Sequence, residues 1–171
     1  MLERPISNFL PLSDTQHLKI GPTLAATLAV VGRFSPRDRE RLPAYYQMLE
    51  QVAGVLREFL LETPPNIGGG LHDVVSALRV GNRMRKLDMP ARRDLLDVVG
   101  KSAGDLLDGW FESDPIKAAF GFDAIVGNFA SPYMPGSAYV LLHHVIGEVN
   151  GKRGAWGHAV GGMGAITQAM A

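Results

Sequence analysis

The sequence contains no cysteine among its 171 residues. Without thiols the chain can form no disulfide framework, no thiolate metal site and no cysteine nucleophile. A cysteine-free composition is typical of a reducing compartment. We therefore expect a cytoplasmic protein, and peripheral attachment to a membrane stays open.

An excess of charge of one sign is also missing, because 17 Lys and Arg balance 17 Asp and Glu. Nucleic-acid-binding domains usually carry a basic excess, so we expect no nucleic-acid partner. No apolar run approaches the roughly 20 residues of a membrane-spanning helix. The segment Met1–Pro5 lacks the basic-then-apolar pattern of a signal peptide. With 46% hydrophobic residues, the composition suits one globular domain with its own core over residues 1–171.

Strand signals are few, and the pattern predicts a mainly α (α+β) fold of roughly seven helices. A small N-terminal β-hairpin is predicted where the apolar runs Asn8–Leu12 and His17–Ile20 flank a polar turn. Pro11 cannot donate to a ladder and suits an edge strand. Because an isolated hairpin is only marginally stable, we expect it to belong to a larger sheet.

The longest helix is predicted to follow Ser35. Ser35 suits the N-cap, Pro36 the first turn, and Asp38 the acidic position of a capping box. An apolar stripe continues from Leu42 to Leu60, so Pro43 is expected to kink this helix without ending it.

Further helices are predicted from periodic apolar positions and start signals. They begin near Pro22, Leu71, Asp88, Ser102 and Ser113, and the last long one covers residues 137–149. The triple glycine 68–70 lacks the Lys-Ser/Thr of a phosphate loop and is interpreted as a connector. The basic cluster between Arg79 and Lys86 is interpreted as favourable charge at a helix C-terminus, with an anion or membrane-surface patch as the alternative.

The adjacent pair His143 and His144 raises the question of a metal site. Neighbouring helical residues point ~100° apart, so the two imidazoles cannot easily share an ion. His144 and Glu148 would share a helix face, but two ligands do not make a site. We predict no metal site and favour packed or hydrogen-bonded histidines, with a ligand-binding or catalytic role as the alternative.

The C-terminal stretch from Gly154 reads as an extended segment, a glycine turn and the first turns of a helix. Gly162–Thr167 is a near miss to the dinucleotide fingerprint, because Thr167 replaces the last glycine. The glycines are expected to allow positive φ. Trp156 and His158 share one face of an extended segment, either as a core tryptophan with a surface histidine or as a pocket wall. A helix begun on so specific a turn suggests a chain cut from a larger protein.

Catalytic motifs of other kinds are missing as well. The sequence has no Gly-x-Ser-x-Gly elbow, and its carboxylates are scattered, so paired acid catalysis finds no support. Composition and spacing alone thus predict a mostly helical domain whose role they leave open.

Several longer segments carry a resemblance to a known family. The segments are Trp110–Asp114, Pro135–His144, Gly154–Gly157 and Gly161–Gln168, with further likeness at Leu10–Asp14 and Arg33–Asp38. Together they resemble the middle of phytoene dehydrogenase-like, FAD-dependent oxidoreductases. Within that family they are most similar to the branch that includes pyridine nucleotide-disulphide oxidoreductase domain-containing protein 2.

The resemblance implies that residues 1–171 are a single helical substrate-binding domain, an insert in a larger two-domain flavoprotein. In this family the glycine fingerprint for FAD lies upstream, so FAD is expected in the parent protein and none bound to this segment alone. The implied reaction is hydride transfer from a substrate carbon to flavin N5. The implied partners are the flavin-binding domain of the same polypeptide and an apolar small-molecule substrate held between the two.

The resemblance also implies which residues face substrate and flavin. It places them at the join between the two domains, with both histidines toward the same cavity: Trp156, His158, Gly161, Gly162, Met163, His143 and His144. An uncovered apolar face would favour a homo-oligomer. Two alternatives stay open, namely a self-contained helical interaction or dimerisation module built on the Leu42–Leu60 stripe, and a carrier of small apolar ligands.

Overall fold

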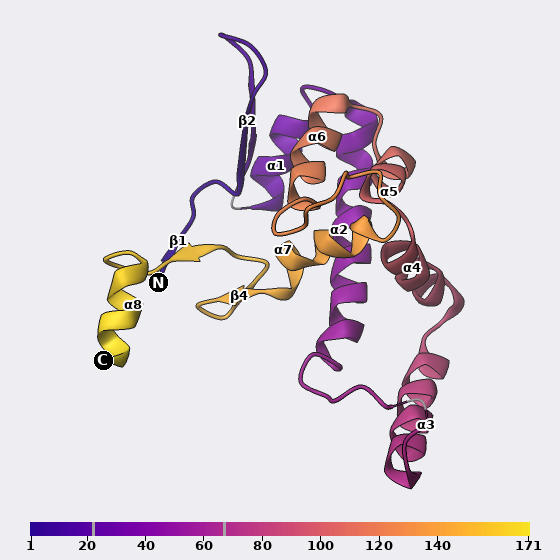
Figure 1. Cartoon of the computed structure of the whole chain (residues 1–171). Helices are drawn as coiled ribbons and strands as arrows, with labels where there is room; N and C mark the ends of the chain where they lie inside the picture. Colours follow the sequence, from indigo (N-terminus) through magenta and orange to yellow (C-terminus); the bar gives the residue numbers. More distant parts are fainter. Residues whose placement is uncertain (22, 67) are drawn as a thin grey trace.

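The computed structural model describes residues 1–21, 23–66 and 68–171. Helices dominate, as the sequence predicts (Figure 1). The predicted helix start at Pro22 lies outside the described residues. In chain order the helices are α1 (Leu24–Val31), α2 (Pro36–Arg57), α3 (Leu71–Lys86), α4 (Met89–Gly100), α5 (Ala103–Trp110), α6 (Asp114–Asp123), the 3₁₀ helix η1 (Ser137–Leu142), α7 (His143–Ile146) and α8 (Met163–Met170).

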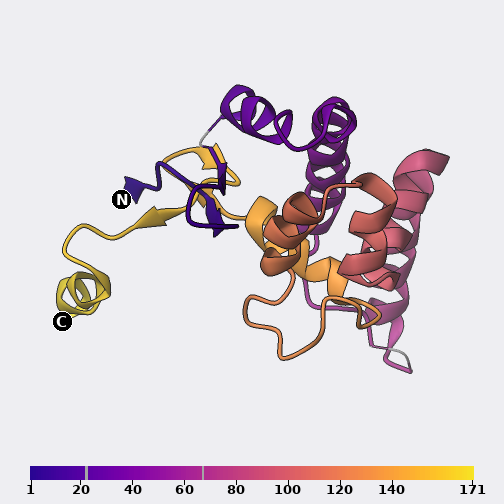
Figure 2. The same cartoon turned by 90° about the horizontal axis from the view of Figure 1, so that it is seen from above.

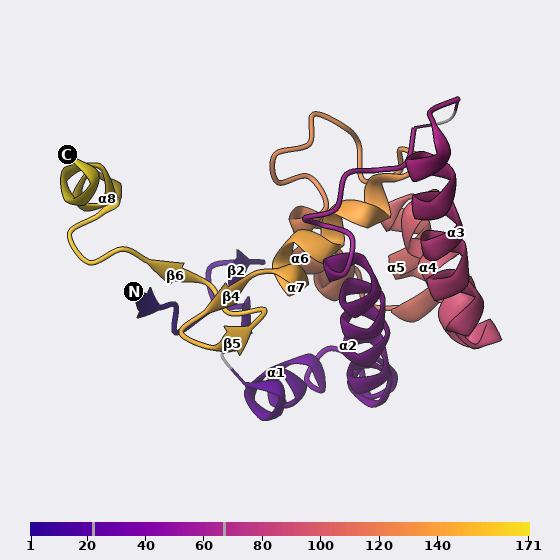
Figure 3. The ribbon, with the colours of Figure 1, turned by 90° about the horizontal axis from the view of Figure 1, so that it is seen from below.

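The strands in the described part of the chain form three antiparallel pairs. The predicted hairpin is confirmed as β2 (Asn8–Pro11) with β3 (His17–Ile20). The expected larger sheet is wrong for the described strands, because β2 and β3 pair only with each other. A second hairpin joins β4 (Glu148–Val149) to β5 (Lys152–Arg153). The third pair joins β1 (Leu2–Glu3) to β6 (Gly157–His158), so residues near the two ends of the chain lie side by side. Both ends are on the same side of the molecule (Figures 1 and 3).

Helix α2 is the centre of the core. Ser35 caps it by accepting the N–H of Asp38, and the helix continues through Pro43 to Arg57, as predicted. The predicted stripe is buried from Leu42 to Ala53, whereas Leu60 lies beyond the helix and is exposed. Tyr45 packs edge-on against Phe111, with 5.0 Å between ring centroids. Each large buried side chain of this kind stabilises the fold by ~1.5–3 kcal/mol.

The predicted capping-box role of Asp38 is wrong. Its side chain is fully buried, and its two carboxylate oxygens accept the N–H groups of Glu112 and Ser113, each at 2.9 Å. Ser35 Oγ in turn donates to Glu112 Oε1 at 2.8 Å. The carboxylate thus satisfies two backbone donors just before α6 and fixes that helix against the start of α2.

The predicted helix over residues 137–149 is wrong in its last part. Its first six residues form η1, α7 ends at Ile146, and Glu148 and Val149 form a strand. Gly147 is extended, and Asn150 and Gly151 take φ of 51° and 78°. Two successive residues with positive φ form the tight turn that an Asn-Gly pair favours between strands. This turn competes with continuation of the helix and closes the β4–β5 hairpin.

Two helices stand apart from the core. Helix α3 has no buried residue and lies at the end of the molecule away from the termini (Figure 1). The predicted C-terminal strand–turn–helix is confirmed as β6, a glycine turn and α8. Figures 2 and 3 show α8 separated from the helical body by the extended segment around β6. Within the described ranges, no helix combines the length and the apolar content needed to cross a membrane.

Candidate functional site

The structure brings three of the predicted site residues into one aromatic cluster. The indole of Trp156 stacks on the imidazole of His144, with ring centroids 4.8 Å apart and planes inclined by 29°. His143 meets the same indole edge-on at 5.5 Å. The histidines come from α7 and the tryptophan from the segment between β5 and β6, so the cluster holds the C-terminal segment against the helical body.

Arg4 connects this cluster to His158. Its backbone N–H donates to the carbonyl of Trp156 at 2.8 Å, and its guanidinium lies 5.7 Å from the indole centroid. Its Nε donates to Nε2 of His158 at 3.1 Å. Because one side chain reaches both rings, Trp156 and His158 lie on the same side of the extended segment, as the strand period predicts.

His144 faces a carboxylate, but a different one from the sequence prediction. Glu148 lies on β4 and is exposed, so the predicted pairing of His144 with Glu148 on one helix face is wrong. Instead, Nε2 of His144 lies 3.4 Å from Oδ1 of Asp123. That nitrogen is buried and makes no hydrogen bond to the described part of the chain. The amide of Asn8 donates to the same Oδ1 at 2.9 Å and to the carbonyl of Ala119 at 3.2 Å.

Burial shifts the proton affinities of both groups in this pair. Desolvation raises the pKa of Asp123 to about 6, against the lowering effect of the hydrogen bond from Asn8. Desolvation lowers the pKa of His144 to about 4, and the nearby positive charges of His143 and Arg4 add to this effect. Between these two values the carboxyl is protonated while the imidazole is neutral. A proton donor and a proton acceptor then face each other across 3.4 Å.

A small cavity of about 330 Å³ opens beside the cluster. It is bounded by the base of the β2–β3 hairpin, by α1, α2, α6 and α7, and by Trp156. Its wall combines aromatic rings with polar groups, namely Asn8, Thr27, Tyr45, Tyr46, Phe120, Asp123, His144 and Trp156. The half-buried Trp156 lines this cavity and His158 is exposed, and a ligand-binding role for either residue stays a prediction.

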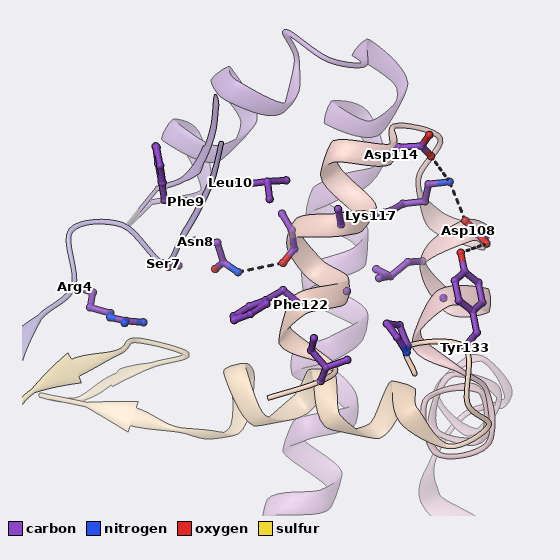
Figure 4. A pocket seen from close by; sticks show the side chains of 17 residues that line it. Arg4, Ser7, Asn8, Phe9, Leu10, Asp108, Asp114, Lys117, Phe122 and Tyr133 are labelled. Atoms are coloured by element: carbon purple, nitrogen blue, oxygen red, sulfur yellow. Dashed lines mark hydrogen bonds and ion pairs between the residues drawn. The ribbon is translucent and has the colours of Figure 1, made fainter. Parts of the chain in front are cut away.

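A larger cavity of about 750 Å³ lies on the other side of the hairpin (Figure 4). Its wall is mainly apolar and comes from β2, α5, α6 and the loop before η1, with Phe9, Leu10, Leu107, Ala118, Phe122, Ile125 and Pro132 among its residues. At one end Asp108 accepts hydrogen bonds from Lys117 at 2.9 Å and from the Tyr133 hydroxyl at 3.4 Å. Arg4 lies at the other end (Figure 4).

Asn8 lines both cavities and stands between them. Its side chain points from β2 to α6, and Figure 4 shows its bond to the α6 backbone. Sequence reasoning found the strand but missed this residue, as it missed Arg4 and Asp123. The available signal was the strand period, which puts Asn8 and Leu10 on one face of β2. The partners on α6 are more than 100 residues away, so no local pattern names them.

The glycine turn lies away from both cavities. Gly161 and Gly162 take φ of 84° and 78°, which confirms the predicted positive φ, and Met163 is 83% exposed. The strand before them, β6, pairs antiparallel with β1. A dinucleotide-binding crevice needs parallel strands joined by a helix, and the described strands pair only antiparallel. The described residues also hold no group of three His, Cys, Asp or Glu placed to bind a metal.

Comparison with known proteins finds relatives along the chain. It is 35% identical over 162 residues to "Pyridine nucleotide-disulfide oxidoreductase domain-containing protein 2" of Rattus norvegicus, covering 90% of this chain and 28% of that protein. The protein of the same name from Mus musculus is 34% identical over 100% of this chain and 30% of its own length. An uncharacterized protein of Mycobacterium tuberculosis is 27% identical over 100% of this chain and 31% of that protein.

These relatives are much longer than the chain, which spans less than a third of the curated relatives that it matches. The predicted likeness to proteins of this name is confirmed, whereas the wider phytoene dehydrogenase-like assignment stays a prediction. No family model matches the chain. No solved structure matches it either.

Proposed function

We propose that this chain is the helical substrate-binding domain of an FAD-dependent oxidoreductase of the phytoene dehydrogenase-like kind. The observation that carries the proposal is the similarity over nearly the whole chain to proteins named as oxidoreductases. The architecture supports it. Residues near both ends of the chain meet in the β1–β6 pair, on one side of the helical body, which suits an insert connected to a second domain on that side.

In this proposal the cavity beside β2 and α6 receives an apolar substrate. Its volume of about 750 Å³ lies within the range of small-molecule sites, and its wall is largely aliphatic and aromatic. Phe9 and Phe122 are more than half exposed in this chain, so a bound apolar molecule would cover surface that water now contacts. The chain binds and orients the substrate and excludes water from it.

The flavin belongs, in this proposal, to the other domain of the same polypeptide. When bound, it supplies the chemistry of hydride acceptance. The described residues offer no parallel strand–helix–strand unit to hold its pyrophosphate, so they do not fit the role of its main binding site. Trp156, Arg4 and His158 lie together beside the β1–β6 pair, and we assign them to the surface that meets the flavin domain.

The proposal gives Asp123 and His144 a proton-holding role next to that surface. A hydride removed from one carbon leaves a proton to be taken from its neighbour when a double bond forms. Asp123 and His144 line the smaller cavity, and Asn8 separates them from the proposed substrate cavity. The pair can hold one proton between Oδ1 and Nε2, and Trp156 covers the imidazole face.

The alternative function is a helical docking module built on the Leu42–Leu60 stripe. The part of this stripe from Leu42 to Ala53 packs inside the chain, so it offers little surface to a partner.

The test uses the longer polypeptide that the natural gene encodes, purified with its flavin. Ala118 is exposed and lines the larger cavity, so Ala118→Phe should narrow that cavity without disturbing the core. We expect it to raise the substrate KM for flavin reduction at least tenfold. The matched control Ala44→Phe adds the same ring at an exposed position of α2 and should leave KM unchanged. Equal KM values for the two variants would reject the cavity as the substrate site.

A further inference from the structure

We propose that α3 attaches the protein peripherally to an anionic lipid surface. Helix α3 contributes no residue to either cavity, so this attachment does not depend on the reaction proposed above. It follows from the direction of the apolar stripe on α3, from the charges beside that stripe, and from the place of α3 in the molecule.

The apolar stripe of α3 points away from the rest of the chain. Its members follow the spacing i, i+3, i+4 and i+7, and their exposed fractions are 81% for Leu71, 51% for Val74, 47% for Val75 and 69% for Leu78. The half-buried positions of the same helix fall on its other side, at Asp73, Ser76, Val80 and Met84. The apolar stripe of a surface helix normally faces the core of the protein. The outward stripe of α3 therefore indicates a surface that another molecule covers.

The charges on α3 indicate which kind of surface binds its exposed apolar stripe. Its exposed basic residues near the stripe are Arg79, Arg85 and Lys86. Asp73 is its one acidic residue, lies on the inward side, and accepts the N–H of Asn66. Arg83 is already engaged by Glu58 and Glu62 on the segment after α2. The outward face thus joins apolar side chains to unopposed positive charge, the combination by which interfacial helices bind anionic lipid.

The place of α3 argues against two other occupants. The helix lies at the opposite end of the molecule from the chain termini, so a domain connected at those termini would have to extend past the helical body to cover it (Figure 1). Two copies of this chain meeting through α3 would bring like charges together, which opposes pairing. At 16 residues the helix is too short to cross the bilayer, and it would lie in the interface plane.

The experiment is co-sedimentation of the full chain with vesicles. One set contains phosphatidylcholine alone, and the other adds phosphatidylserine. We expect binding to the anionic vesicles only, and its loss as salt is raised, because the charge attraction is screened. The double variant Val74→Ser/Leu78→Ser should weaken this binding at least tenfold. These side chains are exposed, so far-UV circular dichroism should stay unchanged.

The matched control removes equal apolar surface from the other exposed helix. Ile166→Ser/Met170→Ser changes two exposed side chains of α8, whose last turn carries no basic residue, and should leave vesicle binding unchanged. A second pair tests the charges without touching the stripe. Arg79→Glu/Lys86→Glu should abolish binding, whereas Arg33→Glu/Arg39→Glu, at exposed positions near α1 and α2, should keep it.

Three results would overturn the proposal. The first is equal binding to neutral and anionic vesicles. The second is equal loss of binding in the α3 and control variants. The third is a lipid-free dimer, seen by light scattering, that the Val74→Ser/Leu78→Ser variant converts to a monomer, because a second copy would then be the occupant. If the serine variant fails to fold, the charge-reversal pair still decides between these outcomes.

Discussion

The indole of Trp156 covers one face of the His144 imidazole, and the imidazole nitrogen Nε2 makes no hydrogen bond with any described residue. This contact joins the segment leading to β6 to helix α7. It also keeps water from a nitrogen that lies 3.4 Å from the Asp123 carboxylate. The stack therefore contributes to the position of the C-terminal segment and to the burial that lowers the pKa of His144.

The first prediction concerns the protonation of His144. The chain has two tryptophans, so Trp110→Phe leaves Trp156 as its one indole. Protonation of the stacked imidazole should change Trp156 emission with a midpoint near pH 4, because burial lowers the pKa of His144 to about 4. The measurement is a fluorescence titration over the pH range in which circular dichroism is constant. The additional change His144→Gln should remove the transition. A transition near pH 6.5 that His144→Gln removes would show that the His144 imidazole is not desolvated, because His143, which also contacts the indole, is present in both proteins.

The second prediction concerns folding stability and Asp123. Burial raises the pKa of this carboxyl from 3.8 to about 6, so the folded state binds its proton more tightly than the unfolded state does. The stability from this group is present below pH 4 and is lost as the pH rises to about 6. Asp123→Asn cannot ionise. Its free energy of unfolding relative to the wild type should therefore rise across this window, by roughly 1–3 kcal/mol.

The measurement is urea unfolding of Asp123→Asn and the wild type at several pH values. The substitution also weakens the hydrogen bond from Asn8, which changes the free energy of unfolding of the variant by the same amount at every pH. The informative quantity is therefore how the difference in unfolding free energy between the two proteins changes with pH. His144 acts in the opposite sense, because its lowered pKa removes stability as the pH falls from 6.5 towards 4. Parallel curves for the two proteins would contradict the raised pKa of Asp123.

The third prediction concerns the buried carboxylate of Asp38. Asp38→Ala leaves the N–H groups of Glu112 and Ser113 without an acceptor, and we expect a loss of roughly 2–4 kcal/mol in unfolding free energy. The matched control is Asp105→Ala, an exposed carboxylate in the first turn of α5, which should cost about 1 kcal/mol or less. Equal losses in chemical denaturation would mean that Asp38 does not fix α6 to α2.

The fourth prediction concerns the turn that ends the helical region. Gly151 has a φ of 78°, which a residue with a Cβ adopts only with strain, so Gly151→Ala should destabilise the protein by about 1 kcal/mol. Gly147 is a matched control, because its φ is −65° and a Cβ added there meets no atom within 4 Å. Gly147→Ala should be close to neutral in thermal unfolding. A larger loss at Gly147 than at Gly151 would refute the turn assignment.

Local signals in the sequence predicted much of this fold. Ser35, Asp88 and Ser102 cap helices where their spacing indicates, because a side-chain oxygen that accepts a nearby N–H needs no distant partner. The Asn150-Gly151 turn was equally local. The predicted helix over residues 137–149 misses it, because the apolar residues before the turn follow a helical period that overlaps the turn signal.

The candidate site was predictable only in part. The sequence singled out Trp156, His143 and His144, and the structure brings these three together. It could not supply Asp123, Asn8 or Arg4, whose roles come from contacts between distant segments. Arg4 and His158, for example, are 154 positions apart. A polar residue on a short strand can have several roles, and the helix that packs against it determines which one it has.

We propose that this chain is the substrate-binding domain of a flavin-dependent oxidoreductase. The most direct measurement is the visible absorbance of the complete polypeptide encoded by the natural gene, purified and titrated anaerobically with an apolar hydride donor. We expect bound FAD that bleaches on reduction, and a bleaching rate that Ala118→Phe lowers and Ala44→Phe does not. A colourless polypeptide that takes up no FAD would show that this chain is not part of a flavoprotein.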